Sequence, residues 1–420
     1  MSDWLTPSEL RVGLGCMRLE PDLAAETIAA AVAAGVTVFD TARAYEGNEA
    51  LLARALHEVE GARIVTKGGM SRPGGAWVPD GRARSLHTDC EASLDALDGL
   101  PIDLYLIHTP DPRRAWRTSV RALAKLVDEG LVTRVGVANV NREQLDEALE
   151  HAPVAAVQVA ISPFDDGALR GGIVDRCVER GIAVIAHSPL GGPRRAARVA
   201  RIPELADIAR AHGVTAAEVA LAWLLALAPN VVTIPGARRP QTARSGAGAT
   251  SLRLDEEEVA RLNASLGGHR TRPQIRPSGG KSGEVVLVMG IPGAGKSRLA
   301  EDYVERGYLR LNRDERGGSL RDVADELGNA LATDSKRVVL DNTYLTRASR
   351  SHVVEVAARH GVAARCIWLE TPLAQAQVNL VERLLDRFGE LPAPERLAEL
   401  ARTEPGVLAP TRQMRAFREL

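Results

Sequence analysis

Short apolar runs alternate with longer amphipathic stretches in the N-terminal part of the chain. Each run is rich in Val, Ile, Leu and Ala, and most of the stretches between runs place apolar residues at helical spacing. The runs are RVGLG (11–15), VTVFDT (36–41), RIVTKG (63–68), IDLYLIH (102–108), RVGVAN (134–139), VAAVQVA (154–160), AVIAHSP (183–189) and VVTIPG (231–236). Eight β/α repeats in about 250 residues are typical of a TIM barrel. We therefore predict an α/β fold that begins with a (β/α)8 TIM barrel, and an open, doubly wound sheet is the alternative.

A second alternating series follows a segment that has no apolar periodicity. Its strand candidates are EVVLVMG (284–290), YLRLN (308–312), RVVLDN (337–342) and RCIWLE (365–370). The segment before it, GGHRTRPQIRPSGGKSGE, is rich in Gly, Pro, Ser and Arg, which is typical of an exposed linker. We predict a barrel over residues 1–267, a basic linker over 268–283 and a compact α/β domain with a mainly parallel sheet over 284–420.

Composition excludes several classes of protein. Lys and Arg total 53 and Asp and Glu total 54, so the formal charge of −1 argues against a globally basic nucleic-acid coat protein. Cys16, Cys90, Cys177 and Cys366 are far apart, and no CxxC or Cys/His cluster suggests a disulfide framework or a zinc site. The N-terminus has no signal-peptide pattern, and no apolar run approaches the ~18 residues of a membrane span. We therefore expect a soluble, cytoplasmic protein with no membrane partner.

Polar residues collect where the predicted barrel strands end. Asp40, Lys67, His108, Asn139 and Gln158 lie at or near the ends of strands two to six. Barrel enzymes build their sites at the C-terminal ends of the strands. A barrel that served only as a scaffold would not require such a ring, so the pattern predicts an active site.

The segments FDTARAYEGNEALLARAL, TKGG and DLYLIHTPD resemble the aldo-keto reductase family, and the resemblance covers roughly residues 11–267. It implies that Asp40, Tyr45, Lys67 and His108 are catalytic in carbonyl reduction. Tyr45 would donate the proton, because a free Tyr with a pKa near ~10 is protonated at neutral pH. Lys67, held by Asp40, would lower the pKa of Tyr45, and His108 would polarise the carbonyl oxygen.

Other segments resemble the cradle in which this family holds its nicotinamide cofactor. The resemblance implies that Asn139 and Gln158 hold the nicotinamide amide, while SPL (188–190) and IPGARRP (234–240) line the diphosphate and adenosine. The full implied set is Asn139, Gln158, His187, Ser188, Leu190, Pro235, Gly236, Arg238, Gln241 and Arg244. His187 replaces a Tyr that usually packs against the nicotinamide, and Ala138 replaces a Ser.

The cations near the adenosine segment bear on cofactor choice. Pro235, Gly236 and Gln241 stand where many family members have Lys, Ser and Arg, while Arg238 and Arg244 lie nearby, as does Arg239. A 2′-phosphate needs cations, so NADP(H) is the expected cofactor and NAD(H) stays open. A solvated loop is the alternative interpretation of Arg238 and Arg239.

A further basic stretch, GGPRRAARVARI, follows the seventh predicted strand. It carries Arg194, Arg195, Arg198 and Arg201, which could receive an anionic substrate at the barrel mouth. A solvated helix face is the alternative interpretation.

The sequence GIPGAGKS (290–297) follows an apolar strand and opens a helix, which is the context a phosphate-binding P-loop requires. Backbone N–H groups of Gly290, Gly293, Ala294 and Gly295 would wrap the phosphates of ATP. Lys296 would reach the β/γ oxygens, and Ser297 would bind Mg²⁺. The C-terminal domain is therefore predicted to be a P-loop NTPase-type kinase.

The segments LNRDERGG and LDNTYLTRASR resemble the 5′-hydroxyl polynucleotide kinases of phage and animal type, over about residues 285–388. The resemblance implies that Asp314 is the general base and that Asp341 orients the Mg²⁺ shell or the acceptor. The other implied contacts are Asn342 and Thr343 to the acceptor and Arg383 to the transferring phosphate.

The arginines of this kinase assignment have alternatives. Arg387 is the second choice for the arginine that stabilises the transferring phosphate, and an exposed helix position is the alternative interpretation of Arg383. The arginine that phage-type enzymes carry after the base is missing near Gly317, where Arg313 or Arg316 could compensate.

Lysine is scarce in the chain. Only five of the 53 cations are Lys, and two of the five, Lys67 and Lys296, fall at positions where these mechanisms call for a compact or flexible ammonium rather than a planar guanidinium.

Together these features predict a bifunctional enzyme that uses NADP(H), ATP and Mg²⁺. The predicted partners are a 5′-hydroxyl nucleic-acid end for the kinase and a carbonyl small molecule or an aldehydic nucleic-acid end for the reductase, as in nucleic-acid end repair. One alternative joins a sugar or aldehyde reductase to a small-molecule kinase. Another is a kinase regulated by a cofactor-sensing barrel.

Overall fold

The computed structural model describes residues 4–266, 283–333, 337–391, 393 and 396. The chain divides into two compact units, Met1–Arg270 and Thr271–Leu420. The predicted linker over 268–283 lies outside the described residues except for residue 283. Each unit has its own sheet and its own hydrophobic core.

The first unit is a barrel of eight parallel strands in the order β1-β2-β3-β6-β7-β8-β9-β10. Parallel bridges from Val12 to Thr233 and from Gly15 to Gly236 join the first strand to the last. The predicted TIM barrel is therefore confirmed, and the doubly wound sheet is excluded. The strands are β1 (Leu14–Gly15), β2 (Val38–Asp40), β3 (Arg63–Gly68), β6 (Ile102–Ile107), β7 (Arg134–Ala138), β8 (Val154–Ala160), β9 (Ala183–His187) and β10 (Val231–Ile234).

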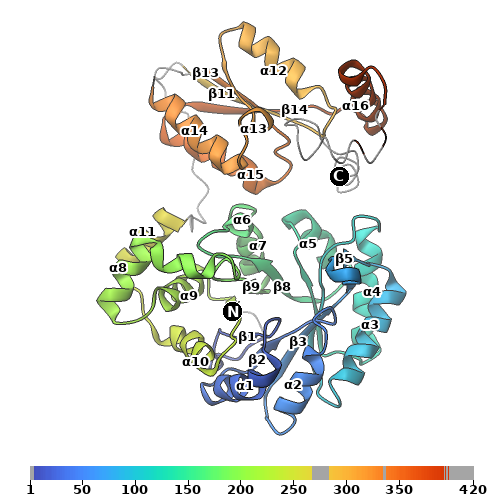
Figure 1. Cartoon of the computed structure of the whole chain (residues 1–420), viewed down its shortest axis with the longest axis vertical. Helices are drawn as coiled ribbons and strands as arrows, with labels where there is room; N and C mark the ends of the chain where they lie inside the picture. The colour runs from blue at the N-terminus through green and yellow to red at the C-terminus, as the bar shows by residue number, and fades with distance from the viewer. Residues whose placement is uncertain (1–3, 267–282, 334–336, 392, 394–395, 397–420) are drawn as a thin grey trace. The chain divides into compact units, whose positions relative to one another are not determined.

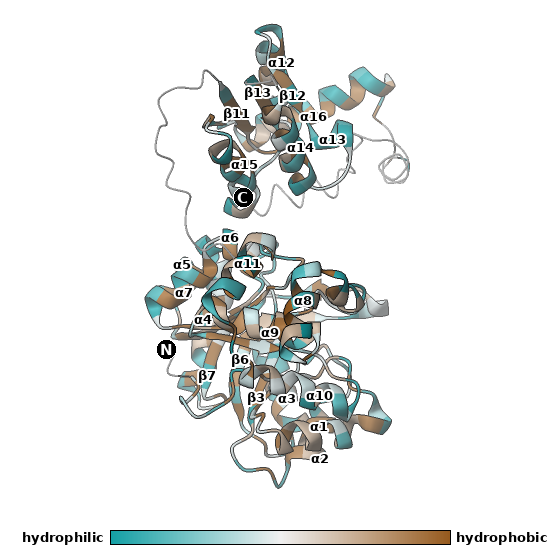
Figure 2. Ribbon diagram, turned by 90° about the vertical axis from the view of Figure 1, so that its left-hand side faces the viewer, coloured by the Kyte–Doolittle hydropathy of each residue, from teal (hydrophilic) through white to brown (hydrophobic). Residues whose placement is uncertain are grey.

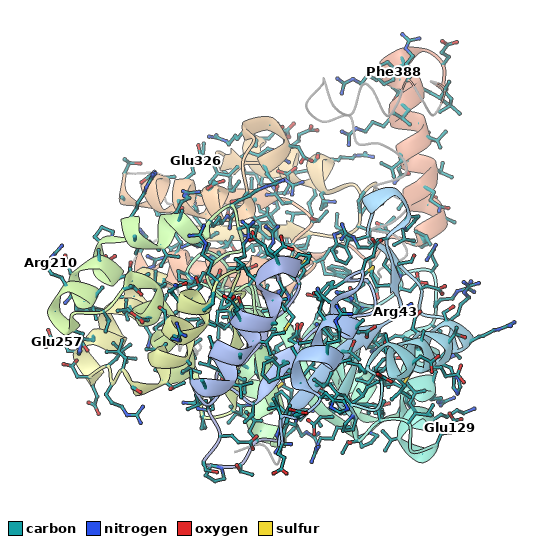
Figure 3. All side chains as sticks on the ribbon, turned by 60° about the horizontal axis from the view of Figure 1, so that its bottom comes forward. Arg43, Glu129, Arg210, Glu257, Glu326 and Phe388 are labelled. Carbon is teal, nitrogen blue, oxygen red and sulfur yellow. The ribbon has the colours of Figure 1, made fainter. Side chains whose placement is uncertain are left out.

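Helices surround these strands (Figure 1). They are α1 (Ala24–Ala33), α2 (Asn48–Leu56), α3 (Ala83–Ala96), α4 (Trp116–Asp128), α5 (Arg142–Leu149), α6 (Gly167–Arg170), α7 (Ile173–Arg180), α8 (Pro203–His212), α9 (Ala216–Leu227), α10 (Pro240–Gly248) and α11 (Glu256–Leu266). Local sequence sets several of their ends: Thr215 and Glu218 form a capping box at the start of α9, and Gly213 ends α8 in a left-handed conformation. Charged side chains such as Arg210 on α8 and Glu257 on α11 point outward (Figure 3).

The strands bury both of their faces. In β6, Leu104 and Leu106 pack inside the barrel, while Tyr105 and Ile107 pack against the helices. Trp4 also belongs to the interior cluster, and its indole Nε1 donates a hydrogen bond of 2.6 Å to Asp103 near the start of β6. Hydropathy follows this layering, with hydrophobic strands inside the barrel and hydrophilic residues on the outer faces of the helices (Figure 2).

The second unit is built on a four-stranded parallel sheet in the order β12-β13-β11-β14. The strands are β11 (Glu284–Met289), β12 (Leu309–Leu311), β13 (Arg337–Asp341) and β14 (Ala363–Trp368), and the helices are α12 (Lys296–Glu305), α13 (Arg313–Arg316), α14 (Leu320–Ala332), α15 (Arg347–Arg359) and α16 (Leu373–Phe388). Helix α12 covers one face of the sheet, and α14 and α15 cover the other (Figure 1). The predicted parallel α/β architecture is confirmed.

Within the described ranges, no single helix has the length and apolar composition needed to cross a membrane. One bent pair, α8 with α9, passes that test only when both helices are counted together.

Candidate active sites

The polar ring inside the barrel follows from the two-residue period of the strands. Val65 in β3 packs in the barrel interior, so Lys67, two residues further along the strand, points the same way. The same two-residue spacing applies to four other strands, in which an interior apolar residue is followed two positions later by a polar residue on the same side. These are Val38 and Asp40, Leu106 and His108, Ala156 and Gln158, and Ile185 and His187. The sequence therefore brings four of the five predicted ring residues, together with His187, into one layer at the C-terminal end of the barrel.

Lys67 and Asp40 form a buried ion pair, with side chains 1% and 6% exposed. Lys67 Nζ donates to Asp40 Oδ1 at 2.7 Å and to the Thr41 carbonyl at 2.7 Å, and Gln158 Nε2 donates to Asp40 Oδ2 at 2.6 Å. Burial, the largest single influence, works to lower the pKa of Lys67, but the charge and hydrogen bond of Asp40 together with the charges of Tyr45 and Cys16 outweigh it, and the pKa is raised. Lys67 therefore remains a fixed positive charge.

Tyr45 lies beside this charge, with Lys67 Nζ 5.3 Å from its ring centroid. Burial raises the pKa of the Tyr45 hydroxyl, and the opposing effect of Lys67 is smaller. We expected Lys67 to lower the Tyr45 pKa overall. The effect of Lys67 has that sign, but burial exceeds it, so Tyr45 keeps its proton.

His108 is a neutral imidazole next to Tyr45, with ring centroids 5.8 Å apart. Burial, and then the charge of Lys67, lower the pKa of His108 to about 3. Its Nδ1 atom is buried and has no hydrogen-bond partner in the described part of the protein. Buried polar atoms ordinarily have partners, so this unsatisfied nitrogen is unusual.

A series of hydrogen bonds leads from His108 to the residues at the end of β9. Asn139 Nδ2 donates to the His108 carbonyl at 2.9 Å, so Asn139 Oδ1 is left to accept from His187 Nε2 at 3.0 Å. His187 Nδ1 then accepts from Ser188 Oγ at 3.3 Å. Burial lowers the pKa of His187 to about 4, so this ring is neutral as well.

A pocket of about 730 Å³ opens above these residues. The predicted residues that line it are Asp40, Tyr45, His108, Asn139, Gln158, His187, Ser188, Leu190, Pro235, Gly236 and Arg238. Gln241 and Arg244 are exposed on α10 and do not line the pocket. Arg238 forms an ion pair with Glu20.

The arginines of the basic stretch after β9 were predicted to receive an anionic substrate at the barrel mouth, and the structure does not place them there. None of its four arginines lines the pocket. Arg195 and Arg198 instead each lie 5.9 Å from the centroid of the Phe164 ring. The structure therefore uses two of these arginines to pack the loop against Phe164.

Trp77 is a pocket residue that the sequence did not predict. It lies in the segment joining β4 (Met70–Ser71) to α3, and its ring contacts both Tyr45 and His108. The one available signal was a large aromatic residue in the Gly- and Pro-rich segment SRPGGAWVP.

The P-loop of the second unit joins β11 to α12. Gly293 and Gly295 have φ of +79° and +90°, which other residues rarely adopt. Lys296 Nζ donates to the carbonyls of Gly290 and Ile291 at 3.0 and 2.9 Å. Burial lowers the pKa of Lys296 to about 8, and the charges of Asp341 and Asp314 offset this only in part.

The ends of β12 and β13 are tied together by Asn312, which the sequence did not single out. Asn312 Nδ2 donates to the Asp341 carbonyl at 2.9 Å, and its Oδ1 accepts from the Asp314 N–H at 2.7 Å. The Arg313 N–H donates to Asn342 Oδ1 at 3.0 Å. This network brings Asp314, Arg313, Asp341 and Asn342 together, with the Asp314 side chain 43% exposed.

The carboxylate of Asp341 is already paired. Arg310 donates from Nε to Oδ1 at 3.0 Å and from Nη2 to Oδ2 at 2.7 Å, and the Asp341 side chain is fully buried. A metal bound by Asp341 would therefore share these oxygens with Arg310. No cluster of three or more His, Cys, Asp or Glu suited to a metal occurs in the described residues.

Helix α16 packs directly on the P-loop. Ala376 and Leu380 contact Ile291 and Ala294. Asn379 Nδ2 donates to the Gly293 carbonyl at 2.8 Å, and Thr371 Oγ1 donates to the Ala294 carbonyl at 3.0 Å.

The two candidate phosphate-binding arginines lie further along α16. Arg383 lies one turn beyond Asn379, on the same side of the helix, and its charge contributes to lowering the pKa of Lys296. Arg387 stacks near Phe388, 5.6 Å from the ring centroid.

The chain belongs to the aldo/keto reductase family, whose model matches residues 11–266. A curated relative, aldo-keto reductase str7 of Strobilurus tenacellus, is 31% identical over 264 residues, which are 55% of this chain and 77% of the relative. Residues 285–405 match the model of an AAA domain. The comparisons thus show a reductase barrel joined to a P-loop domain, and the resemblance to polynucleotide kinases is not confirmed by them.

Two solved structures are similar to the barrel. An aldo-keto reductase from Klebsiella pneumoniae in complex with NADPH is 26% identical with a TM-score of 0.54, over 63% of this chain and 95% of that one. The glycerol dehydrogenase of Gluconobacter oxydans is 25% identical with a TM-score of 0.56, over 66% of this chain and 98% of that one.

Proposed function

We propose that the barrel is an NADP(H)-dependent carbonyl reductase and that the P-loop domain is an ATP-dependent kinase for a polynucleotide 5′-hydroxyl. The observation that carries the reductase assignment is the buried Lys67–Asp40 pair beside a protonated Tyr45 and a neutral His108 that lines the pocket. NADPH supplies the hydride when bound. Tyr45 gives the proton to the substrate oxygen, which His108 polarises.

The pocket residues support a dinucleotide cofactor. Asn139 offers its amide and His187 its ring face to the nicotinamide end, and Arg238 provides a cation for a 2′-phosphate. The bound NADPH of the Klebsiella pneumoniae relative supports the same choice. NAD(H) is the alternative, because Glu20 already neutralises Arg238.

NADPH oxidation with a panel of aldehydes tests the reductase. We expect Tyr45→Phe to lower kcat/KM at least about 10²-fold, since general acid catalysis contributes roughly that much. Tyr308→Phe, in the other unit, is the matched control and should leave the rate unchanged. Equal rates in wild type and Tyr45→Phe would remove the assignment.

The kinase assignment rests on the P-loop and on Asp314, whose backbone N–H is held by Asn312 and whose half-exposed carboxylate pairs with Arg313. In this proposal Asp314 accepts the proton of the acceptor hydroxyl, Arg383 stabilises charge on the transferring phosphate, and Ser297 binds Mg²⁺. Arg313, Asn342 and Thr343 would contact the acceptor. Asp341 positions the neighbouring ends of β12 and β13 through its pair with Arg310.

Labelled ATP offered with a 5′-hydroxyl oligonucleotide, or with polyols, tests the acceptor. We expect transfer to the oligonucleotide that is lost in Asp314→Asn and kept in Asp325→Asn, an exposed carboxylate on α14. Transfer to polyols alone would replace the nucleic-acid acceptor with a small molecule. A kinase rate that changes with NADPH would favour a regulatory barrel.

A further inference from the structure

We infer that Tyr344 is a positioning residue of the P-loop unit, whose hydroxyl orients the Asn342 side chain and, through it, the loop that carries Asp314. The inference rests on the proposed phosphoryl transfer, in which Asp314 is the base. Tyr344 is fully buried, so it acts on the reaction through its neighbours rather than by touching a substrate.

Tyr344 has a backbone conformation that a bulky residue rarely adopts. Its φ of +42° lies in the left-handed region, and such a conformation persists only where the surrounding contacts hold it. Arg350 Nη1 donates to the carbonyl of Tyr344 at 2.8 Å and to that of Leu345 at 3.0 Å. The tyrosine ring belongs to the same core cluster as Leu311 and Val353. These contacts on the backbone and on the ring fix the position of the side chain.

The Tyr344 hydroxyl is joined to the Asp314 loop by two hydrogen bonds through Asn342. Asn342 Nδ2 donates to the Tyr344 hydroxyl at 3.3 Å, and Asn342 Oδ1 accepts from the Arg313 N–H at 3.0 Å. Because an amide donates from its nitrogen and accepts at its oxygen, the bond to Tyr344 sets which end of Asn342 faces Arg313. A phenylalanine would fill the core in the same way but would leave this N–H of Asn342 without its acceptor. An amide nitrogen has two hydrogens, so Asn342 can make this bond and still contact the acceptor as proposed above.

Two asparagine side chains hold the turn on which the proposed base lies. Arg313 and Asp314 are the first two residues of α13, and their N–H groups donate to Asn342 and to Asn312, respectively. Asn312 also donates to the Asp341 carbonyl, so both asparagines tie this turn to the end of β13. A general base acts only when its carboxylate is aligned with the proton that it removes. Loss of the bond from Asn342 should therefore misalign Asp314 without altering the P-loop.

Phosphoryl transfer by the full chain tests the inference, with a 5′-hydroxyl oligonucleotide as acceptor, or a polyol if wild type uses that instead. In Tyr344→Phe we expect kcat to fall roughly fivefold, the factor that one such hydrogen bond contributes, with KM for ATP unchanged. In Asn342→Ala kcat should fall further. Adding Tyr344→Phe to Asn342→Ala should then have no additional effect, because the hydroxyl has no amide left to orient.

Tyr303→Phe is the matched control. Tyr303 is a buried tyrosine on α12, and its hydroxyl accepts a hydrogen bond from Arg365. This variant also loses a tyrosine hydroxyl from the core of the same unit, but it should keep the wild-type kcat.

Hydrogen exchange reads the same contact without turnover. In the peptide spanning residues 309–318, followed by mass spectrometry, one amide should exchange at least about fivefold faster in Tyr344→Phe and in Asn342→Ala than in wild type. Exchange in Tyr303→Phe should equal that of wild type.

The inference is overturned if Tyr344→Phe keeps the wild-type kcat, or if its effect multiplies with that of Asn342→Ala, since the two residues would then act separately. A fall in kcat accompanied by an equal loss of ATP affinity would also overturn it, because a general loosening of the unit would explain both. If wild type phosphorylates neither acceptor but exchange is faster in Tyr344→Phe, the kinase proposal fails and the contact stands. If wild type phosphorylates neither acceptor and exchange is unchanged, both fail.

Discussion

Lys67 and Lys296 both lie near the C-terminal ends of parallel strands, yet their hydrogen-bond partners differ in charge and their pKa values are shifted in opposite directions. Lys67 bonds a carboxylate and is almost fully buried, and its pKa is raised. Lys296 bonds two backbone carbonyls, and its pKa is lowered to about 8. The difference lies in the counter-charge, since burial works against the positive charge in both cases.

This contrast separates two uses of an ammonium group. The partner of Lys67 is built into the barrel, so its charge is a permanent part of the site. Lys296 has only neutral partners in its loop, which leaves its charge uncompensated at short range until an anion binds. We infer that the positive charge in the barrel site is balanced by the protein itself, whereas the positive charge in the P-loop is balanced only when an anionic ligand binds.

The largest expected effect comes from exchanging each lysine for arginine. Lys67→Arg should lower reductase kcat/KM by about 10³-fold and spare the kinase, because a planar guanidinium cannot replace the buried ammonium. Lys296→Arg should lower the rate of phosphoryl transfer by a similar factor and spare the reductase activity. Both activities are measured on each preparation, with Lys125→Arg as a surface control. A variant that loses both activities while remaining folded by circular dichroism would contradict this separation.

The pH dependence of ATP binding sharpens the comparison. A pKa of about 8 means that Lys296 loses its proton in the free protein as pH rises through 8, while a bound polyphosphate favours the protonated form. The Kd for ATP should therefore increase above pH 8, by up to about tenfold per pH unit. Calorimetric titrations from pH 6.5 to 9.5 measure this. Lys296→Arg should bind more weakly but without the slope, and an equal slope in both proteins would contradict the assignment.

A smaller effect is expected at the contact between α16 and the P-loop. Asn379→Ala removes the hydrogen bond to the Gly293 carbonyl, worth about 1 kcal/mol, and should raise KM for ATP by roughly fivefold with a smaller change in kcat. Val378→Ala, on an exposed position of the same helix, is the control. Identical KM values in the two variants would show that the bond does not position the loop.

The smallest effect is a predicted absence of titration. The pKa values of His108 and His187 are about 3 and about 4, below the ordinary 6.5, so both rings are protonated only in acid. Reductase kcat/KM should therefore show no histidine inflection between pH 5.5 and 8. His187→Tyr should keep the same flat profile. An inflection near pH 6.5 in wild type that disappears in this variant would contradict the neutral state of His187.

The barrel was predictable because buried parallel strands are continuous apolar runs. The bounds of β3 and β8 coincide with the predicted segments 63–68 and 154–160. Strand β1 is two residues long and lies within the predicted segment 11–15. The short strand β4, which pairs with β5 (Val78–Pro79) a few residues further along the chain, was not predicted, because two residues carry little signal. The four candidate catalytic residues could be predicted because Asp40 and Lys67 lie at the C-terminal ends of β2 and β3, and Tyr45 and His108 lie shortly after the ends of β2 and β6.

What the sequence could not provide depends on register and on loop paths. Arg310 reaches Asp341 because β12 pairs with β13 in parallel, with Arg310 opposite Val339. Nothing local in either segment indicates that pairing. Trp77 likewise reaches Tyr45 through the course of a loop rather than through any periodic pattern.

The tight approach of α16 to the P-loop has a practical consequence for dissecting the protein. A Cβ on Gly293 would lie 2.2 Å from the Ala376 carbonyl oxygen, so loop and helix meet backbone to backbone. A minimal fragment of the P-loop unit trimmed before residue 373, where the described four-stranded sheet is already complete, would lose the helix that bonds the Gly293 carbonyl. Any such fragment has to extend at least to Phe388, and a failed assay on a shorter piece would say nothing about the catalytic residues themselves.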